Sequence, residues 1–245
     1  MLKNHAPLLF KLLSNDLRWG LLKALSTSDL RVQELADLLG QPQNLISYHL
    51  QKMRDYGLIR DHPSIADGRE VYYGIHLSQV HELFKFTQES LHPGLVLERP
   101  DEYSFPALRV LFLCTQNSAR SQMAEGFLRT KGKGIIQAFS AGTDPAPAVN
   151  PNAIQVMSEF NIDIRGQRSK NLAQFLDQPF DTIITVCDRA REACPVFAGN
   201  PTRIHWSIPD PTEISGTSDE RYHAFRSTAL ELDERINYFL SSNQK

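Results

Sequence analysis

The stretch that decides the fold lies near the middle of this 245-residue chain and reads Val110-Leu111-Phe112-Leu113-Cys114-Thr115-Gln116-Asn117-Ser118-Ala119-Arg120. Its apolar start predicts a buried strand that ends at Cys114, and the residues that follow predict a loop leading into a helix. A loop that enters a helix N-terminus aims backbone N–H groups and the positive end of the helix dipole at a bound anion. The same environment lowers the pKa of a cysteine thiol. We therefore predict that Cys114 is a nucleophile, although a lone cysteine is more often a buried apolar residue.

The residues around Cys114 suit a tetrahedral oxyanion. Arg120 carries a planar, permanently charged fork that binds two oxygens and stabilises charge in a transition state. Ser121 can donate a hydrogen bond to the thiolate, and Asn117 can hold the shape of the loop through its side chain. The candidate oxyanion-binding residues are Thr115, Gln116, Asn117, Ser118, Ala119 and Ser121.

Two further cysteines follow a second apolar run, residues 180–186. This run predicts a buried parallel strand that delivers Cys187 to the same sheet edge as Cys114. Cys194 lies seven residues further, across a short charged helix that must loosen before the two sulfurs bond. Such a pair can take up two oxidising equivalents, whereas ester hydrolysis needs neither thiol. The alternative is a pair of buried structural cysteines.

Composition bounds the class of protein. A hydrophobic fraction of 41% and a charged fraction of 22% are typical of soluble globular chains. No run approaches the roughly 18 apolar residues of a membrane span, and residues 1–7 lack a signal-peptide pattern, so we expect a cytoplasmic protein without membrane contact. The net charge of −2 argues against indiscriminate nucleic-acid binding. An odd number of cysteines, three, in such a protein favours reactive or buried thiols over a structural disulfide framework. We predict no bound cofactor.

Proline and glycine near residues 92–105 divide the chain, which predicts a domain over 1–92, a linker over 93–105 and a second domain over 106–245. In the first domain, patterning and capping residues predict helices near 7–13, 16–25, 32–39, 42–56 and 77–91. A hairpin is predicted from residues 58–60 and 70–75. This order is typical of an α+β winged helix-turn-helix domain.

The helix predicted at 42–56 has an apolar face, formed by Ile46, Leu50 and Met53, that should pack on the core. Its opposite face carries side chains suited to base edges and phosphates, and the hairpin ends in a basic residue. The candidate DNA-binding residues are Asn44, Ser47, Tyr48, Gln51, Arg54 and Arg69. A small helical protein-interaction module is the alternative.

Residues 34–40 and 45–53 resemble the turn and recognition helix of the arsenic- and metal-responsive repressor family. The resemblance implies operator DNA as a partner and a homodimer formed through the flanking helices. Members that sense arsenite or soft metals commonly use cysteines in this domain, but residues 1–92 contain none. The histidines there are scattered, and we predict no metal site; they are His5, His49, His62, His76, His81 and His92.

The run from Cys114 through Ser121 closely resembles the low-molecular-weight tyrosine phosphatase family, especially its arsenate reductase branch. Residues 140–142 close a second strand as in that family, and Asp210 stands in an Ile-Pro-Asp-Pro loop where the family keeps its general acid. The resemblance implies an α/β domain with a parallel, doubly wound sheet. Gln116 replaces a frequent glycine, so the backbone there must avoid a positive φ.

For the arsenate reductase branch, the resemblance implies that Cys114 attacks arsenic while Asp210 protonates the leaving water. Cys187 then attacks Cys114 and releases arsenite, and Cys194 takes over the disulfide, which thioredoxin or another dithiol reduces. A phosphotyrosine phosphatase with a DNA-binding arm is less favoured, because Thr212 replaces the usual tyrosine and two extra thiols are present. A third hypothesis is a repressor whose thiols sense rather than catalyse. Nothing in the sequence decides between reductase and sensor.

Overall fold

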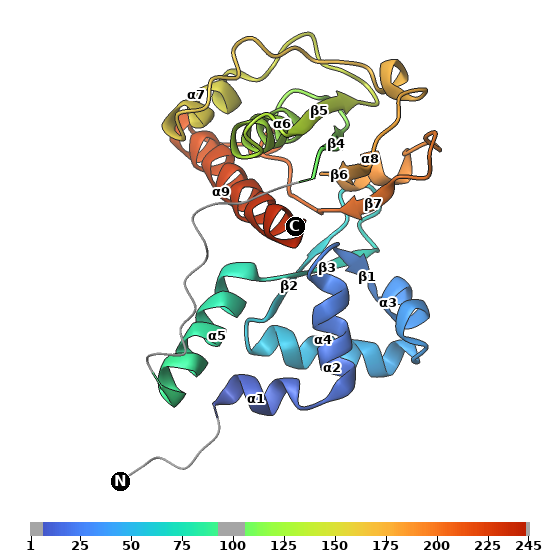
Figure 1. Cartoon of the computed structure of the whole chain (residues 1–245), viewed down its shortest axis with the longest axis vertical. Helices are drawn as coiled ribbons and strands as arrows, with labels where there is room; N and C mark the ends of the chain where they lie inside the picture. The colour runs from blue at the N-terminus through green and yellow to red at the C-terminus, as the bar shows by residue number, and fades with distance from the viewer. Residues whose placement is uncertain (1–6, 93–105, 244–245) are drawn as a thin grey trace. The chain divides into compact units, whose positions relative to one another are not determined.

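The computed structural model describes residues 7–92 and 106–243. The chain divides into two compact units, Met1–Glu102 and Tyr103–Lys245 (Figure 1). The predicted linker, residues 93–105, lies outside the described residues, as does His5, so the exact domain boundaries stay a prediction. Both predicted fold classes are confirmed.

The N-terminal unit packs five helices around a small antiparallel sheet with strand order β1-β3-β2. Its elements are α1 (Leu8–Leu13), α2 (Asp16–Leu25), β1 (Leu30–Arg31), α3 (Val32–Leu39), α4 (Gln43–Asp55), β2 (Ile59–Pro63), β3 (Val71–Ile75) and α5 (Leu77–Leu91). The helix-turn-helix consists of α3 and α4, and the β2–β3 hairpin is the wing.

Local sequence sets the ends of these helices. Asn15 begins α2 by accepting a hydrogen bond from the backbone N–H of Arg18 at 3.1 Å. Gly40 ends α3 in the left-handed conformation at φ 62°, which favours glycine. The predicted core face of α4 is confirmed, because Ile46, Leu50 and Met53 are fully buried.

The C-terminal unit is built on a four-stranded parallel sheet with strand order β5-β4-β6-β7. The strands are β4 (Leu108–Cys114), β5 (Ile136–Gly142), β6 (Thr182–Thr185) and β7 (Thr202–His205). The helices are α6 (Arg120–Lys131), α7 (Pro151–Glu159), η2 (a 3₁₀ turn, Leu172–Phe175), α8 (Asp188–Glu192) and α9 (Ser218–Ser242).

Strand β4 lies inside the sheet, which explains its unbroken apolar run. Residues 110–113 are fully buried between neighbouring strands β5 and β6. Helix α6 packs on β4 and β5 and against α9, whereas α8 packs on β4 and β6 (Figure 1). All strands of a parallel sheet point the same way, so the chain leaves β4 and β6 at the same edge of the sheet.

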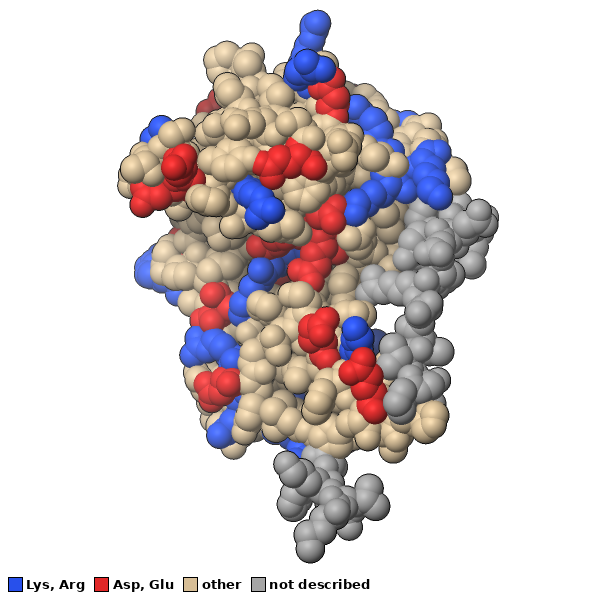
Figure 2. All heavy atoms as spheres, turned by 90° about the vertical axis from the view of Figure 1, so that its left-hand side faces the viewer, with Lys and Arg blue, Asp and Glu red and all other residues tan. Residues whose placement is uncertain are grey.

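The surface of the described residues is mixed in charge. On the face drawn in Figure 2, Lys and Arg alternate with Asp and Glu, without an extended field of one sign. Within residues 7–92 and 106–243, no helix combines the length and apolar character that crossing a membrane requires.

Protonation of His49 should destabilise the N-terminal unit. Its imidazole is buried on α4, Nδ1 has no hydrogen-bond partner among the described residues, and burial together with the charge of Arg18 lowers its pKa. The unfolded chain, with a histidine pKa near 6.5, therefore binds the proton more readily than the folded chain does. We expect stability to fall as the pH drops below about 6.5.

Hydrogen exchange of α4 in the full chain, measured from pH 7.5 to pH 5, checks this prediction after correction for intrinsic exchange rates. His49→Leu should flatten the pH dependence, whereas His81→Leu on α5 should leave it in place. An unchanged dependence in His49→Leu would contradict the assignment.

Candidate functional site

The thiol of Cys114 lies at the carboxyl end of β4, inside the turn that leads to α6. Its Sγ accepts a hydrogen bond from the backbone N–H of Asn117 at 3.1 Å and lies 2.9 Å from Oγ of Ser121. Cys114 is buried, with 3% of its surface exposed. The loop N–H and the Ser121 hydroxyl therefore fix the position of the sulfur, as a nucleophile requires.

Asn117 holds the turn in shape. Its backbone has a positive φ of 46°, a conformation that asparagine tolerates better than most residues. Its side-chain amide donates to the hydroxyls of Ser121 and Ser140, both at 2.8 Å, and its Oδ1 accepts from the backbone N–H of Lys170 at 2.7 Å. Gln116 has no positive φ, as expected for its replacement of glycine.

The buried carboxylate of Glu125 holds Ser140, which in turn accepts a hydrogen bond from Asn117. Glu125 accepts a hydrogen bond from Oγ of Ser140 at 2.5 Å, and its charge is balanced by Nζ of Lys170 at 3.2 Å and by Arg129. Sequence reasoning missed Glu125 and Lys170. Glu125 lies one helical turn after Ser121 on α6, and this spacing could have indicated that both side chains lie on the same face of the helix. Lys170 comes from a distant loop, and no local pattern indicates its partner.

Arg120 and Asp210 lie together although 90 residues separate them. One guanidinium nitrogen of Arg120 donates to the carbonyl of Ile208 at 2.8 Å, and another forms an ion pair with Asp210. Thr212 donates from its backbone N–H and its hydroxyl to the other carboxylate oxygen of Asp210, at 3.0 and 2.8 Å. The residue that replaces the usual tyrosine thus orients the predicted general acid.

Cys187 lies beside the Cys114 loop. The backbone N–H of Val186 donates a hydrogen bond to the carbonyl of Leu113 at 2.7 Å. The end of β4 and the residue that follows β6 therefore lie side by side. Sγ of Cys187 lies 3.5 Å from Oγ1 of Thr115 and accepts a hydrogen bond from the N–H of Ala190 at 3.4 Å. Burial raises the pKa of the Cys187 thiol, against the opposing effect of the Arg120 cation.

Cys194 is half-buried, beyond the end of α8. Its Sγ lies 3.9 Å from a guanidinium nitrogen of Arg203, and burial raises its pKa despite that cation. All three cysteines are free thiols. The helix predicted between Cys187 and Cys194 is shorter than expected and ends at Glu192, consistent with Pro195, which disfavours helical backbone at the residue before it.

The predicted DNA-binding residues are exposed on the helix-turn-helix and the wing. Asn44, Ser47, Tyr48, Gln51 and Arg54 lie on the outer face of α4, with 56% of Tyr48 exposed. Both arginines among the predicted DNA-binding residues have acidic partners. Arg54 pairs with Asp61, and Arg69 at the wing tip pairs with Asp67 at 3.0 Å.

No group of three or more His, Cys, Asp or Glu side chains within the described ranges is placed to hold a metal ion. The contacts described above define the candidate site as a thiol, an arginine, an aspartate and a backbone N–H group at one sheet edge, with a second thiol alongside. This is the construction of a cysteine-dependent enzyme that acts on a tetrahedral oxyanion.

Comparison with known proteins agrees with this class. Residues 109–245 match the model of the low molecular weight phosphotyrosine protein phosphatase family, and the chain belongs to that family. Residues 15–61 match the bacterial regulatory protein arsR family, so the N-terminal unit carries a helix-turn-helix of that family.

The C-terminal domain is similar to bacterial arsenate reductases. The arsenate reductase of Halalkalibacterium halodurans is 39% identical over 135 residues, which are 55% of this chain and 96% of that protein. The arsenate reductase of Bacillus subtilis is 34% identical over the same shares of both chains. A solved structure described as an arsenate reductase in oxidized state is 32% identical, with a TM-score of 0.49, and covers 56% of this chain and 98% of its own.

Gly142→Ala should distort the Cys114 loop. A Cβ at Gly142 would lie 2.5 Å from the carbonyl oxygen of Thr115 and 2.9 Å from the backbone nitrogen of Asn117, so the loop must move. Since a displacement of about 1 Å can cost about 10²-fold in activity, we expect phosphate to bind at least tenfold more weakly. Isothermal titration with inorganic phosphate measures this.

The matched control is Gly166→Ala, where an added Cβ has no neighbouring atom within 4 Å. It should bind phosphate as the native protein does. Equal phosphate affinity in Gly142→Ala would show that the loop tolerates the displacement.

Proposed function

We propose that the C-terminal domain is an arsenate reductase that works through Cys114, Cys187 and Cys194 and draws electrons from thioredoxin or another dithiol. The observation that carries this proposal is the second thiol at the nucleophile: Thr115, next to Cys114, contacts Sγ of Cys187. Phosphate-ester hydrolysis needs only one thiol, whereas reduction of As(V) to As(III) needs a second thiol to supply electrons.

In the first step, the Cys114 thiolate attacks arsenic and one arsenate oxygen leaves as water. The loop N–H groups of residues 115–119 and the Arg120 fork bind the remaining oxygens. A bound oxyanion competes with Asp210 for the guanidinium, which releases the Asp210 carboxyl to protonate the leaving oxygen. Ser121 supports the thiolate, and Asn117 fixes the loop.

In the second step, the Cys187 thiolate attacks Sγ of Cys114. The sulfur–arsenic bond breaks, its electron pair stays on arsenic, and arsenite leaves while a Cys114–Cys187 disulfide forms. Cys194 then attacks Cys187, frees Cys114 and carries the disulfide to a half-buried position. An external dithiol reduces it by the same exchange. Thioredoxin keeps cytosolic dithiols reduced, and we therefore place the protein in the cytoplasm.

The cysteine series tests this cascade. With arsenate, thioredoxin, thioredoxin reductase and NADPH, the native chain should oxidise NADPH, and Cys187→Ser or Cys194→Ser should abolish multiple turnovers. Cys194→Ser should still release one equivalent of arsenite, because the first disulfide needs only Cys114 and Cys187.

Hydrolysis of p-nitrophenyl phosphate is the internal control for this series. It should depend on Cys114 and survive loss of Cys187 or Cys194, because only the first nucleophile attacks the ester. Hydrolysis without any arsenate-dependent NADPH oxidation in the native chain would instead identify a phosphatase.

We further propose that the N-terminal domain binds operator DNA as a homodimer. The outer face of α4 supplies groups for base edges, and Arg69 on the wing suits a phosphate. Helices α1 and α5, which contact each other, leave large apolar side chains exposed, and these support a dimer interface. They are Leu8, Phe10, Phe84, Phe86 and Leu91.

Arg69→Ala should weaken DNA binding in a salt-dependent way. On a duplex selected by the protein from a random pool, the slope of log affinity against log salt should fall by about one, because one phosphate contact is lost. Arg165→Ala is a matched control, since Arg165 pairs with Asp163 as Arg69 pairs with Asp67. Equal slopes in the native chain and Arg69→Ala would exclude Arg69 from the interface.

A sensing role for the same thiols is the second candidate. Residues 1–92 contain no cysteine, so thiol recognition of arsenite must come from the C-terminal domain. Arsenite should release the selected duplex from the native chain but not from a variant with all three cysteines changed to serine. Release from the serine variant would exclude thiol sensing.

A further inference from the structure

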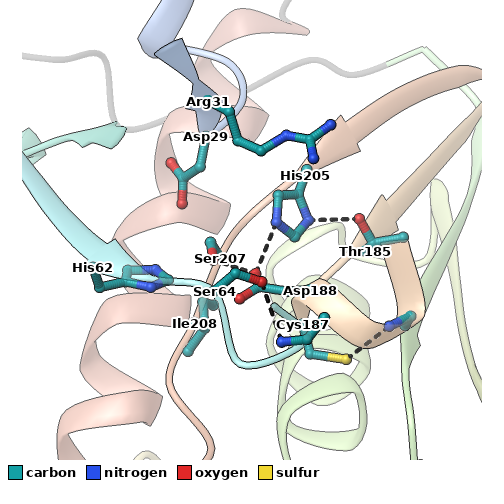
Figure 3. A network of polar contacts seen from close by, with 12 residues as sticks. Asp29, Arg31, His62, Ser64, Thr185, Cys187, Asp188, His205, Ser207 and Ile208 are labelled. Atoms are coloured by element: carbon teal, nitrogen blue, oxygen red, sulfur yellow. Dashed lines mark hydrogen bonds and ion pairs between the residues drawn. The ribbon is translucent and has the colours of Figure 1, made fainter. Parts of the chain in front are cut away.

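A buried polar cluster stands behind Cys187 and takes no part in the steps above. Asp188 accepts hydrogen bonds on Oδ1 from Nε2 of His205 at 3.1 Å and from the Ser207 hydroxyl. Nδ1 of His205 lies 2.8 Å from Oγ1 of Thr185. Figure 3 shows these side chains converging from β6, the start of α8 and the end of β7. All four residues are buried, and Asp188 is only 1% exposed.

The chemistry of these groups fixes the direction of the bonds. An ionised carboxylate only accepts, so with Asp188 ionised Nε2 of His205 carries the hydrogen and donates the hydrogen bond to Oδ1 of Asp188. The order Thr–His–Asp looks like a nucleophilic triad, but Thr185 lies within β6 with 5% of its surface exposed. The cluster is therefore a means of holding the backbone together rather than a second reactive centre.

The cluster fixes the backbone that directly follows Cys187. Asp188 follows Cys187 directly and is the first residue of α8, while His205 is the last residue of β7. Directly before Cys187, the backbone N–H of Val186 donates a hydrogen bond to the carbonyl of Leu113 on β4. Cys187 is thus fixed to two neighbouring strands, one through each adjacent residue.

The other end of α8 is held differently. Helix α8 ends at Glu192, and the N–H groups of Ala193 and Cys194 donate to the carbonyls of Arg189 and Arg191 at 3.1 and 3.3 Å. The side chain of Cys194 contacts Arg203 on β7 and the backbone of Pro195. A five-residue helix is about 7.5 Å long, beyond the ~4.4–6.8 Å between Cα atoms across a disulfide. The backbone must therefore move before Cys187 and Cys194 can bond.

We propose that Asp188 and His205 are positioning residues that keep Cys187 at Cys114 while the chain around Cys194 moves to meet it. This inference rests on the proposed function. In the step concerned, the Cys187 thiolate attacks Sγ of Cys114 in the arsenic-bound intermediate. The Cys114–Cys187 disulfide forms, the sulfur–arsenic bond breaks with its electron pair on arsenic, arsenite leaves, and the proton of Cys187 passes to solvent.

The test compares two reactions of the same full-length proteins. In a single turnover with arsenate, quenched with iodoacetamide and mapped for disulfides, Asp188→Ala and His205→Ala should form the Cys114–Cys187 disulfide and arsenite at least about tenfold more slowly. Their hydrolysis of p-nitrophenyl phosphate, which needs only Cys114, Arg120 and Asp210, should stay within about twofold of the native rate.

Two further variants separate positioning from general destabilisation. His205→Gln can place an amide N–H near the position of Nε2 and should restore most of the arsenite rate. Glu192→Ala, at the exposed end of α8, should behave as the native chain does. A parallel loss of both reactions, or an unchanged arsenite rate in the alanine variants, would overturn the positioning role.

Failure of the proposed function gives a different result. A native chain that hydrolyses p-nitrophenyl phosphate but forms no arsenite is not an arsenate reductase. In that case, oxidation of the reduced proteins with diamide decides the inference: slower formation of the Cys114–Cys187 disulfide in the alanine variants supports it, and equal rates overturn it.

Discussion

The rest of the site depends on one backbone constraint, the left-handed turn at Asn117. This turn aims the backbone N–H of Asn117 at Sγ of Cys114. The side chain of Asn117 ties the turn to Ser121, to Ser140 and to the backbone of Lys170. A positive φ is unfavourable for most residues and persists only when several bonds enforce it. Here the buried carboxylate of Glu125 anchors one member of that set, Ser140. The cradle is therefore rigid before an oxyanion arrives, which is what electrostatic catalysis requires.

The second constraint is the parallel pairing of β4 and β6, because it places two thiols of different character at one edge of the sheet. The backbone N–H of Asn117 donates to Sγ of Cys114, whereas burial raises the pKa of Cys187 and of Cys194. A thiol with a raised pKa forms less of the nucleophilic thiolate. The pairing thus places a thiol held by the loop beside one whose thiolate is disfavoured by burial.

Local pattern was enough to predict most of this architecture. The apolar run to Cys114, the loop after it and the capping signals at Asn15 and Gly40 all act over a few residues, and the structure agrees with them. Strand β1 was not predicted, because two residues carry no alternation, and its pairing with β3 is a tertiary effect. Lys170 and His205 were missed as members of the site for the same reason: each meets its partner across a long separation in sequence, and no spacing rule indicates such a contact.

The two domains divide recognition and chemistry in an unusual way. The N-terminal half carries a helix-turn-helix of the bacterial regulatory protein arsR family, yet every thiol of the chain lies in the C-terminal half. Soft trivalent arsenic is held by thiolates rather than by hydroxyls or carboxylates. Any effect of arsenite on DNA binding must therefore begin at Cys114, Cys187 or Cys194. In the proposed reductase cycle the oxidation state of these same sulfurs changes, so the proposed catalytic and sensing roles would draw on one set of atoms. A thiol that holds arsenite would then be withdrawn from turnover, and sensing would require reduced cysteines.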